Sequence, residues 1–244
     1  MRVFLDAPMT SFALPANCAQ IKRVGSFHEL VTTRFGGGIN ALCWERTLAG
    51  DYAEIVTLLG GEDGITSLDE ARLRALPVTT LGRAAVGLLC DDLQLLRDHG
   101  LAPVLDCIHG YPRDEHPGPV PTDVYSFHAD SAPIEADTYL CTYHGPSSEG
   151  LRNEDAERRV DLPATRAELL RLFGGADDAD FQGYLKENCY DLHYAAKPPA
   201  RPFSFGVGNL WRIAVEYPGS PVPPCIHRAP ALEPGQPPRL LLIS

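Results

Sequence analysis

The pattern of apolar positions divides the chain into a helical first part and a β-rich second part. Apolar side chains recur at helical spacing over residues 48–59 and 80–99, and glycine follows each segment. Between them, Ser67-Leu68-Asp69-Glu70 has the form of a capping box and predicts the start of a short helix. We therefore expect residues 1–100 to be mostly helical and to pack outside a sheet.

Beyond residue 100, the sequence pattern changes to short runs of β-favouring residues separated by turns rich in proline and glycine. The runs cover residues 102–109, 124–130, 138–144, 203–217, 225–228 and 239–244. Such spacing is typical of an antiparallel barrel or jelly roll. We predict a single domain over 1–244 that is mainly β with flanking helices (α+β), because chains of this length often form one β-rich unit.

One longer segment, residues 151–202, interrupts the predicted strands. It contains two helical patterns, at 164–173 and near 180–187. A long insertion at the rim of a barrel often has a functional role. We expect this insertion to form a helical lid or a wall of the substrate site.

Composition narrows the function classes. The chain has a formal net charge of −11 and no Lys/Arg cluster, which disfavours nucleic acid as a partner because phosphates would be repelled. No apolar run reaches the roughly 20 residues that a membrane span needs, and the first residues do not resemble a secretory signal. The seven cysteines lack a CxxC pair, which favours reduced thiols. We therefore expect a cytoplasmic protein.

Three residues form the candidate metal centre. His128 and Asp130 are two positions apart on a predicted strand, so their side chains leave the same face, and His227 opens a later short strand. Two imidazoles and one carboxylate make the facial triad that suits iron(II), because three coordination positions stay open. The alternatives are a surface His–Asp hydrogen bond for the first pair and a capped loop histidine for His227.

Two arginines are candidates for binding carboxylates. Arg239 opens the last predicted strand, where its guanidinium could pair bidentately with a carboxylate, or merely pair with an acidic rim residue such as Glu233. Arg228 follows His227 directly and could either bind a substrate carboxylate or cap its loop.

In the order HxD, distant His and late Arg, the chain resembles the iron(II)- and 2-oxoglutarate-dependent oxygenases. The resemblance implies a double-stranded β-helix (a jelly-roll, cupin-like barrel), iron(II) bound by His128, Asp130 and His227, and O2 and 2-oxoglutarate as co-substrates. It also implies that Arg239 holds the far carboxylate of 2-oxoglutarate. Tyr143 falls where several members place a co-substrate tyrosine, although a tyrosine on a strand can equally be a packing residue.

A closer likeness is to an uncharacterised bacterial family with the motifs WxR, FHxD, CTYxGPGTEW and HRSP. Here they read CWERTL, SFHAD, CTYHGPSSEGL and IHRAP, from about residue 41 to the end. Two departures stand out: GPGTEW has become GPSSEG, and an RxS that many 2-oxoglutarate binders carry is missing after Arg239.

These observations lead to three hypotheses. The first is an oxygenase that hydroxylates, desaturates or cyclises a small polar metabolite, such as an amino acid derivative, and acts as a monomer or homodimer. The second is a cupin-like metal-binding protein or an iron dioxygenase that does not use 2-oxoglutarate; it leaves Arg239 outside the pocket. The third is a metal-free barrel that serves as an interaction scaffold.

Overall fold

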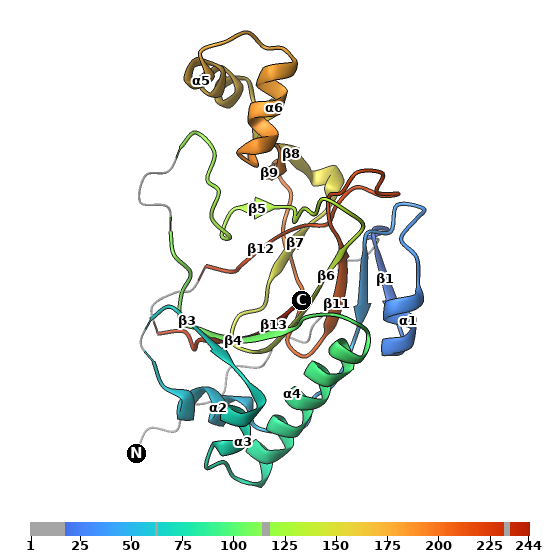
Figure 1. Ribbon diagram of the computed structural model, residues 1–244, viewed down its shortest axis with the longest axis vertical. Coiled ribbons are helices and arrows are strands. Elements are labelled where there is room, and N and C mark those ends of the chain that lie inside the picture. Colours follow the sequence, from blue (N-terminus) through green and yellow to red (C-terminus); the bar gives the residue numbers. More distant parts are fainter. Residues whose placement is uncertain (1–17, 62, 114–117, 232–234) are drawn as a thin grey trace.

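Two β-sheets with helices beside them make up the protein (Figure 1). A computed structural model describes residues 18–61, 63–113, 118–231 and 235–244. Strands of the major sheet lie in the order β1-β2-β11-β6-β13-β4-β3, and those of the minor sheet in the order β10-β7-β12-β5-β9-β8. Neighbouring strands are antiparallel except for the edge pair β1 and β2, which is parallel. The predicted β-rich architecture with flanking helices is confirmed at this level.

Most strands of the second half lie within the predicted β-favouring runs. The major sheet consists of β1 (Ile21–Val24), β2 (Ala41–Trp44), β3 (Ile65–Leu68), β4 (Val104–Ile108), β6 (Asp137–His144), β11 (Leu210–Ala214) and β13 (Arg239–Ile243). The minor sheet consists of β5 (Phe127–His128), β7 (Glu149–Leu151), β8 (Ala156–Arg158), β9 (His193–Ala196), β10 (Phe203–Ser204) and β12 (Ile226–Arg228).

Four helices accompany the major sheet: α1 (Phe27–Thr32), α2 (Tyr52–Leu59), α3 (Glu70–Ala75) and α4 (Thr80–Asp98). The longest, α4, is capped by the Thr79 hydroxyl and is followed by Gly100, whose φ of 82° suits only glycine well. Its buried face joins α2, α3 and one face of the major sheet in the largest hydrophobic cluster. The predicted packing of the N-terminal helices outside the sheet is confirmed.

The first hundred residues also contain strands that the helical reading missed. β1, β2 and β3 all join the major sheet, and the predicted capping box is wrong by two residues. Ser67 lies in β3 and donates its hydroxyl hydrogen bond to Asp106, while Asp69 caps α3 by accepting from Arg72. The carboxylate of Asp69 is as good a cap as a serine hydroxyl, and the pairing of β3 with β4 decides between them.

The other face of the major sheet points toward the minor sheet. Trp211 and Ile213 of β11 and Leu241 of β13 form a second hydrophobic cluster with Phe203 and Phe205, which come from the minor-sheet side. Alternation along β6 decides which residues reach this inner space: Leu140 belongs to the inner cluster, whereas its neighbours in sequence pack with the helices.

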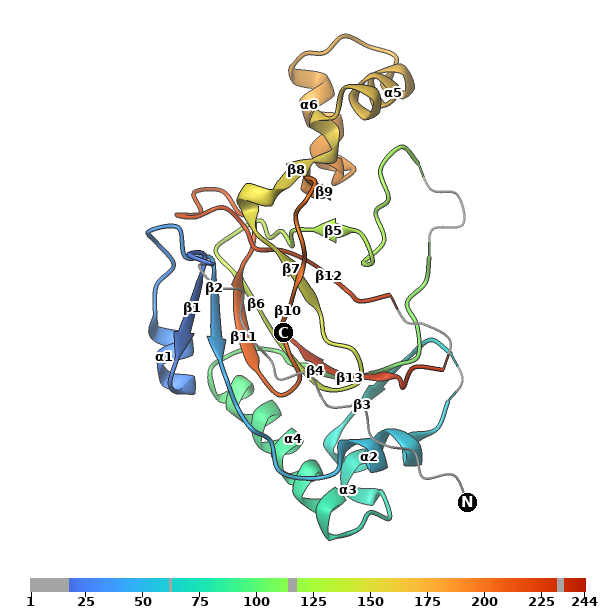
Figure 2. The same ribbon diagram turned by 180° about the vertical axis from the view of Figure 1, so that it is seen from behind.

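The predicted insertion contributes strands as well as helices. Helices α5 (Pro163–Phe173) and α6 (Ala179–Glu187) project beyond the minor sheet, while β8 and β9 form its edge (Figure 2). Short 3-10 turns connect them: η1 (Asn153–Asp155), η2 (Arg159–Asp161) and η3 (Tyr190–Leu192). The two helices share a small hydrophobic cluster with Val120, which lies in the loop before β5.

In the described ranges, no helix combines the length and the apolar character that crossing a membrane requires.

Candidate metal centre

The three predicted metal ligands meet on the inner face of the minor sheet. His128 of β5 and His227 of β12 are direct partners across the two strands, and Asp130 lies two residues beyond His128. Their candidate ligand atoms all lie within 4.8 Å of one another. His227 also lies beside Phe205 of the inner cluster, with ring centroids 6.5 Å apart, so the site faces the space between the sheets.

The carboxylate of Asp130 lies between the two imidazoles. Its Oδ1 is 3.9 Å from Nε2 of His128, and its Oδ2 is 3.8 Å from Nε2 of His227. The side chain of Asp130 is 31% exposed, against 10% for that of His227. A ligand or solvent molecule can therefore approach the centre from the carboxylate side.

Hydrogen bonds orient each ligand. Nδ1 of His128 donates to the backbone carbonyl of Ser126 at 2.8 Å, and Nδ1 of His227 is 3.4 Å from that of Cys225. A carbonyl oxygen can only accept, so Nδ1 carries the proton and Nε2 presents its lone pair. The hydroxyl of Thr138 donates to Oδ2 of Asp130 at 2.6 Å. This is the arrangement in which outer groups fix metal ligands.

Burial favours the metal-binding form of His128. Desolvation lowers the pKa of this imidazole, and the neighbouring His227 lowers the pKa further, while the carbonyl of Ser126 acts in the opposite direction. A neutral imidazole is the form that coordinates a metal ion. His128 is thus ready to bind a cation without first losing a proton near neutral pH.

Arg239 is a buried cation on the inner side of the major sheet. Its exposure is 0%, and its hydrogen-bond acceptors are neutral hydroxyl groups: Tyr111 at 3.1 Å, Ser148 at 2.9 Å and Thr142 at 3.4 Å. Within the described residues, it has no carboxylate partner, and its Nε has no acceptor. Burial lowers its pKa because the charged form is poorly solvated. Glu233, the acidic partner considered above, lies outside the described residues.

A short path connects Arg239 with the metal ligands. Ser148, which accepts from Arg239, immediately precedes β7, and Gly150 of β7 is the strand partner of His227. A side chain at Gly150 would collide with the rings of Phe203 and Phe205. These two rings therefore occupy the space beside His227 that glycine leaves.

Tyr143 does not belong to this group of residues. It lies on the helix-covered face of the major sheet, where its hydroxyl donates to Asp92 of α4 at 2.6 Å and its ring stacks on Tyr52 of α2. The co-substrate role inferred from the family resemblance is therefore not supported by its position, because alternation along β6 turns Thr142, not Tyr143, toward Arg239.

Arg228 also points away from the metal ligands. Adjacent residues of a strand face opposite sides, and Ile226, which shares the side of Arg228, packs in the outer cluster of the minor sheet. Its guanidinium pairs with Glu149 at 2.6 Å and lies over the ring of Phe127. Both interactions account for Arg228 without a substrate carboxylate.

Sequence reasoning missed the residues that surround the ligands. Ser126 and Ser148 lie inside the SFHAD and GPSSEG motifs and Thr138 opens a predicted strand, but only tertiary pairing shows what these hydroxyl side chains contact. Tyr111 was likewise hidden in a loop. The proline-rich stretch after Tyr111 predicted a loop, but it did not predict that this loop borders the site.

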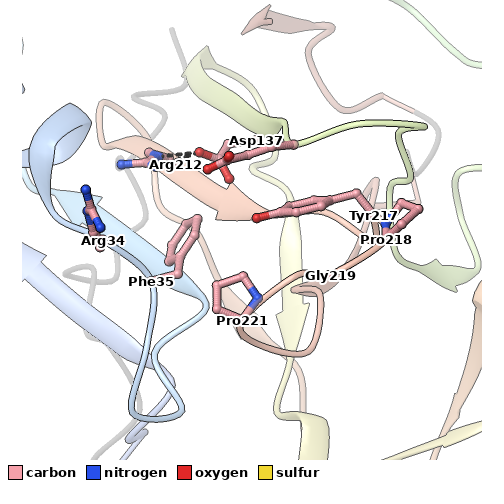
Figure 3. A pocket seen from close by; sticks show the side chains of 9 residues that line it. Arg34, Phe35, Asp137, Arg212, Tyr217, Pro218, Gly219 and Pro221 are labelled. Carbon is pink, nitrogen blue, oxygen red and sulfur yellow. Dashed lines mark hydrogen bonds and ion pairs between the residues drawn. The ribbon is translucent and has the colours of Figure 1, made fainter.

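A separate hollow of about 650 Å³, shown in Figure 3, is lined in part by Arg212 of β11. Arg212 lies between Trp211 and Ile213 of the inner cluster, so it faces the opposite side of the major sheet. Phe35 and Tyr217 form two of its walls, and Arg212 pairs with Asp137 at 2.7 Å. Arg212 also donates to three backbone carbonyls at the end of α1, those of Leu30, Val31 and Thr33. In contrast to Arg239, this guanidinium has a carboxylate partner.

Comparisons with protein-family models, with curated proteins and with solved structures returned no match. The geometry of the site is therefore the basis on which a function is assigned.

Proposed function

We propose that this protein is a non-haem iron(II), 2-oxoglutarate-dependent oxygenase that oxidises a C–H bond of a small polar metabolite. The observation that carries the proposal is the combination of two features between the sheets. One is the convergence of His128, Asp130 and His227, and the other is Arg239, a buried cation with neutral partners.

The donor set fits iron(II). Two neutral imidazoles and one carboxylate on one side of an ion leave three positions for co-substrate and oxygen, whereas structural zinc sites are closed by four protein ligands. The oriented Nε2 atoms and the carboxylate held by Thr138 would support such an ion after the three ligand atoms move closer together. On this proposal the two sheets form a double-stranded β-helix, with the metal at the minor sheet.

Arg239 fits the far carboxylate of 2-oxoglutarate. A buried guanidinium that lacks a counter-ion is costly, and a carboxylate in reach of its fork would form charge-assisted bonds. The orphaned Nε and the nearby hydroxyls of Ser148 and Tyr111 supply donors for such an anion. The negative charge that the protein does not provide would thus come with the co-substrate.

When bound, iron(II) and 2-oxoglutarate supply the oxygen-activating redox chemistry. The residues of the chain bind, orient and exclude water. Phe203, Phe205 and Trp211 keep the inner space apolar beside His227, and the exposed side of Asp130 is the approach for substrate. With iron bound, the carboxylate of Asp130 would take a coordination site that halogenation needs, which favours hydroxylation, desaturation or ring formation.

The second hypothesis, a metal-binding protein that does not use 2-oxoglutarate, requires Arg239 to lie outside the pocket. The position of Arg239 on the inner side of the major sheet and its contact with Ser148 beside β7 favour the first hypothesis. A small-molecule substrate remains the proposed partner, because the acidic chain has no basic surface run for nucleic acid.

Anaerobic addition of iron(II) and then 2-oxoglutarate tests the proposal. We expect a visible metal-to-ligand charge-transfer band, and its loss in Arg239→Met but not in Tyr143→Phe, a matched change on the opposite face of the same sheet. Iron binding without a band would favour the second hypothesis, and no iron binding would favour the scaffold. A substrate screen by oxygen consumption, with succinate as the second product, would then identify the metabolite class.

A further inference from the structure

Three histidines, not two, form a row across the minor sheet. His227 of β12 pairs with His128 of β5, and His128 pairs on its other side with His193 of β9. Direct partners on neighbouring strands project to the same face, so His193 shares the inner face with the two proposed ligands. Its ring centroid is 5.9 Å from that of His128, and its side chain is buried.

Ser126 connects His193 with His128. The hydroxyl of Ser126 is 2.8 Å from Nδ1 of His193, and the backbone carbonyl of the same residue accepts from Nδ1 of His128 at 2.8 Å. The hydroxyl also lies 2.9 Å from the carbonyl of Pro121 and 3.0 Å from that of Asp123. A hydroxyl has a single proton and these carbonyls can only accept, so the tautomer of His193 with its proton on Nδ1 is the one that satisfies a carbonyl and the imidazole together, with His193 donating to Ser126.

The insertion holds the same segment from a second side. Val120 is buried in the cluster of α5 and α6, and the carbonyl of Leu192 accepts from the backbone N–H of Ala129 at 3.0 Å. The segment that carries Ser126 and His128 is therefore fixed at both ends by residues 151–202.

We infer that His193 is a positioning residue of the metal site, and that it couples the helical insertion to metal binding. Through Ser126 it holds the carbonyl that fixes the Nδ1–H tautomer of His128, so that the lone pair of Nε2 stays free for a metal ion. The inference rests on the metal site of the proposed function, but not on the use of 2-oxoglutarate.

Substitutions at His193 separate positioning from packing. His193→Phe keeps a ring of similar size and removes the Nδ1 donor, whereas His193→Asn keeps an N–H close to Nδ1 and removes the ring. Loss of an outer partner of a metal ligand typically weakens metal binding about 10- to 100-fold. We expect this loss, with an altered ligand-field spectrum, in the Phe variant and substantial recovery in the Asn variant.

The assay is titration with cobalt(II) alone, followed by its ligand-field absorption, on the full chain. Tyr194→Phe is the matched control, because Tyr194 is the next residue of β9 and packs in the outer cluster. Ser126→Ala serves as the second variant: it removes the hydroxyl and keeps the carbonyl, and we expect weaker cobalt binding there too. Hydrogen exchange should also slow over 190–196 when cobalt is added to the wild type, but not to the Phe variant.

The opposite ranking would overturn the inference. If His193→Phe and Ser126→Ala bind cobalt like the wild type while His193→Asn does not, His193 is a packing residue. If the wild type binds no cobalt, the metal site and this inference fail together. Cobalt binding that depends on His193, without a 2-oxoglutarate band for iron, would refute the oxygenase and leave the inference standing.

Discussion

Replacing Arg239 by methionine should change the stability of the protein little. The substitution should abolish the stabilisation by 2-oxoglutarate. The guanidinium forms three hydrogen bonds to hydroxyl groups, each with a net value of about 1.5–3 kcal/mol because the donor is charged. Against this stands the desolvation of a buried ion, which costs several kcal/mol. Methionine fills a similar volume without that cost.

The difference between the hydrogen-bond energy and the desolvation cost of Arg239 sets the expected change in the free energy of unfolding. Removing one partner of a buried ion pair typically costs about 3–5 kcal/mol, but Arg239 has no carboxylate partner among the described residues. We therefore expect the free energy of unfolding of Arg239→Met to be no more than about 1 kcal/mol below that of the wild type. For the wild type, 2-oxoglutarate at 100 times its Kd should add about 2.7 kcal/mol. At about 2–4 °C per kcal/mol, Tm should rise by about 5–11 °C.

Thermal unfolding under anaerobic conditions, with iron(II) and with or without 2-oxoglutarate, measures both quantities. Arg239→Met should keep its Tm without the co-substrate and show no shift with it. A variant destabilised by 3 kcal/mol or more would mean that Arg239 is a structural cation with a partner of its own. An equal shift in both proteins would mean that 2-oxoglutarate binds elsewhere.

Three further substitutions test the surroundings of the site. Tyr143→Phe removes a buried hydrogen bond to the carboxylate of Asp92 and should lower the free energy of unfolding by about 1.5–3 kcal/mol. The affinities for cobalt and 2-oxoglutarate should not change. A lower affinity for 2-oxoglutarate would support the co-substrate role of Tyr143. Gly150→Ala should destabilise the protein and weaken cobalt binding, because the new methyl group meets the ring of Phe203; wild-type behaviour would show that the rings can move aside. Burial lowers the pKa of His144, so on acidification the unfolded chain binds this proton before the folded protein does, and stability should fall as pH drops below about 6.5. His144→Gln should reduce the slope of the free energy of unfolding against pH in this range. An unchanged slope would contradict the lowered pKa.

The local sequence pattern was enough to predict elements that one continuous segment forms by itself. The helix α4 is confirmed over Thr80–Asp98, and β6 and β13 lie where the apolar runs predicted them. The same argument put His128 and Asp130 on one face of a predicted strand. The strand β5 is shorter than predicted and ends at His128, yet the two side chains still converge. The parallel β1–β2 edge was not predictable in this way, since short apolar runs fit helix or strand equally well.

What the sequence determined by itself was the set of chemical groups and their local spacing: an HxD pair, a later histidine and an arginine on the last strand. Only the tertiary structure decided which of them meet. Pairing between strands about a hundred residues apart put His227 beside His128, turned Tyr143 toward the helices and enclosed Arg239 among hydroxyl groups. Burial and strand register are properties of the whole packed chain, so no local pattern contains them.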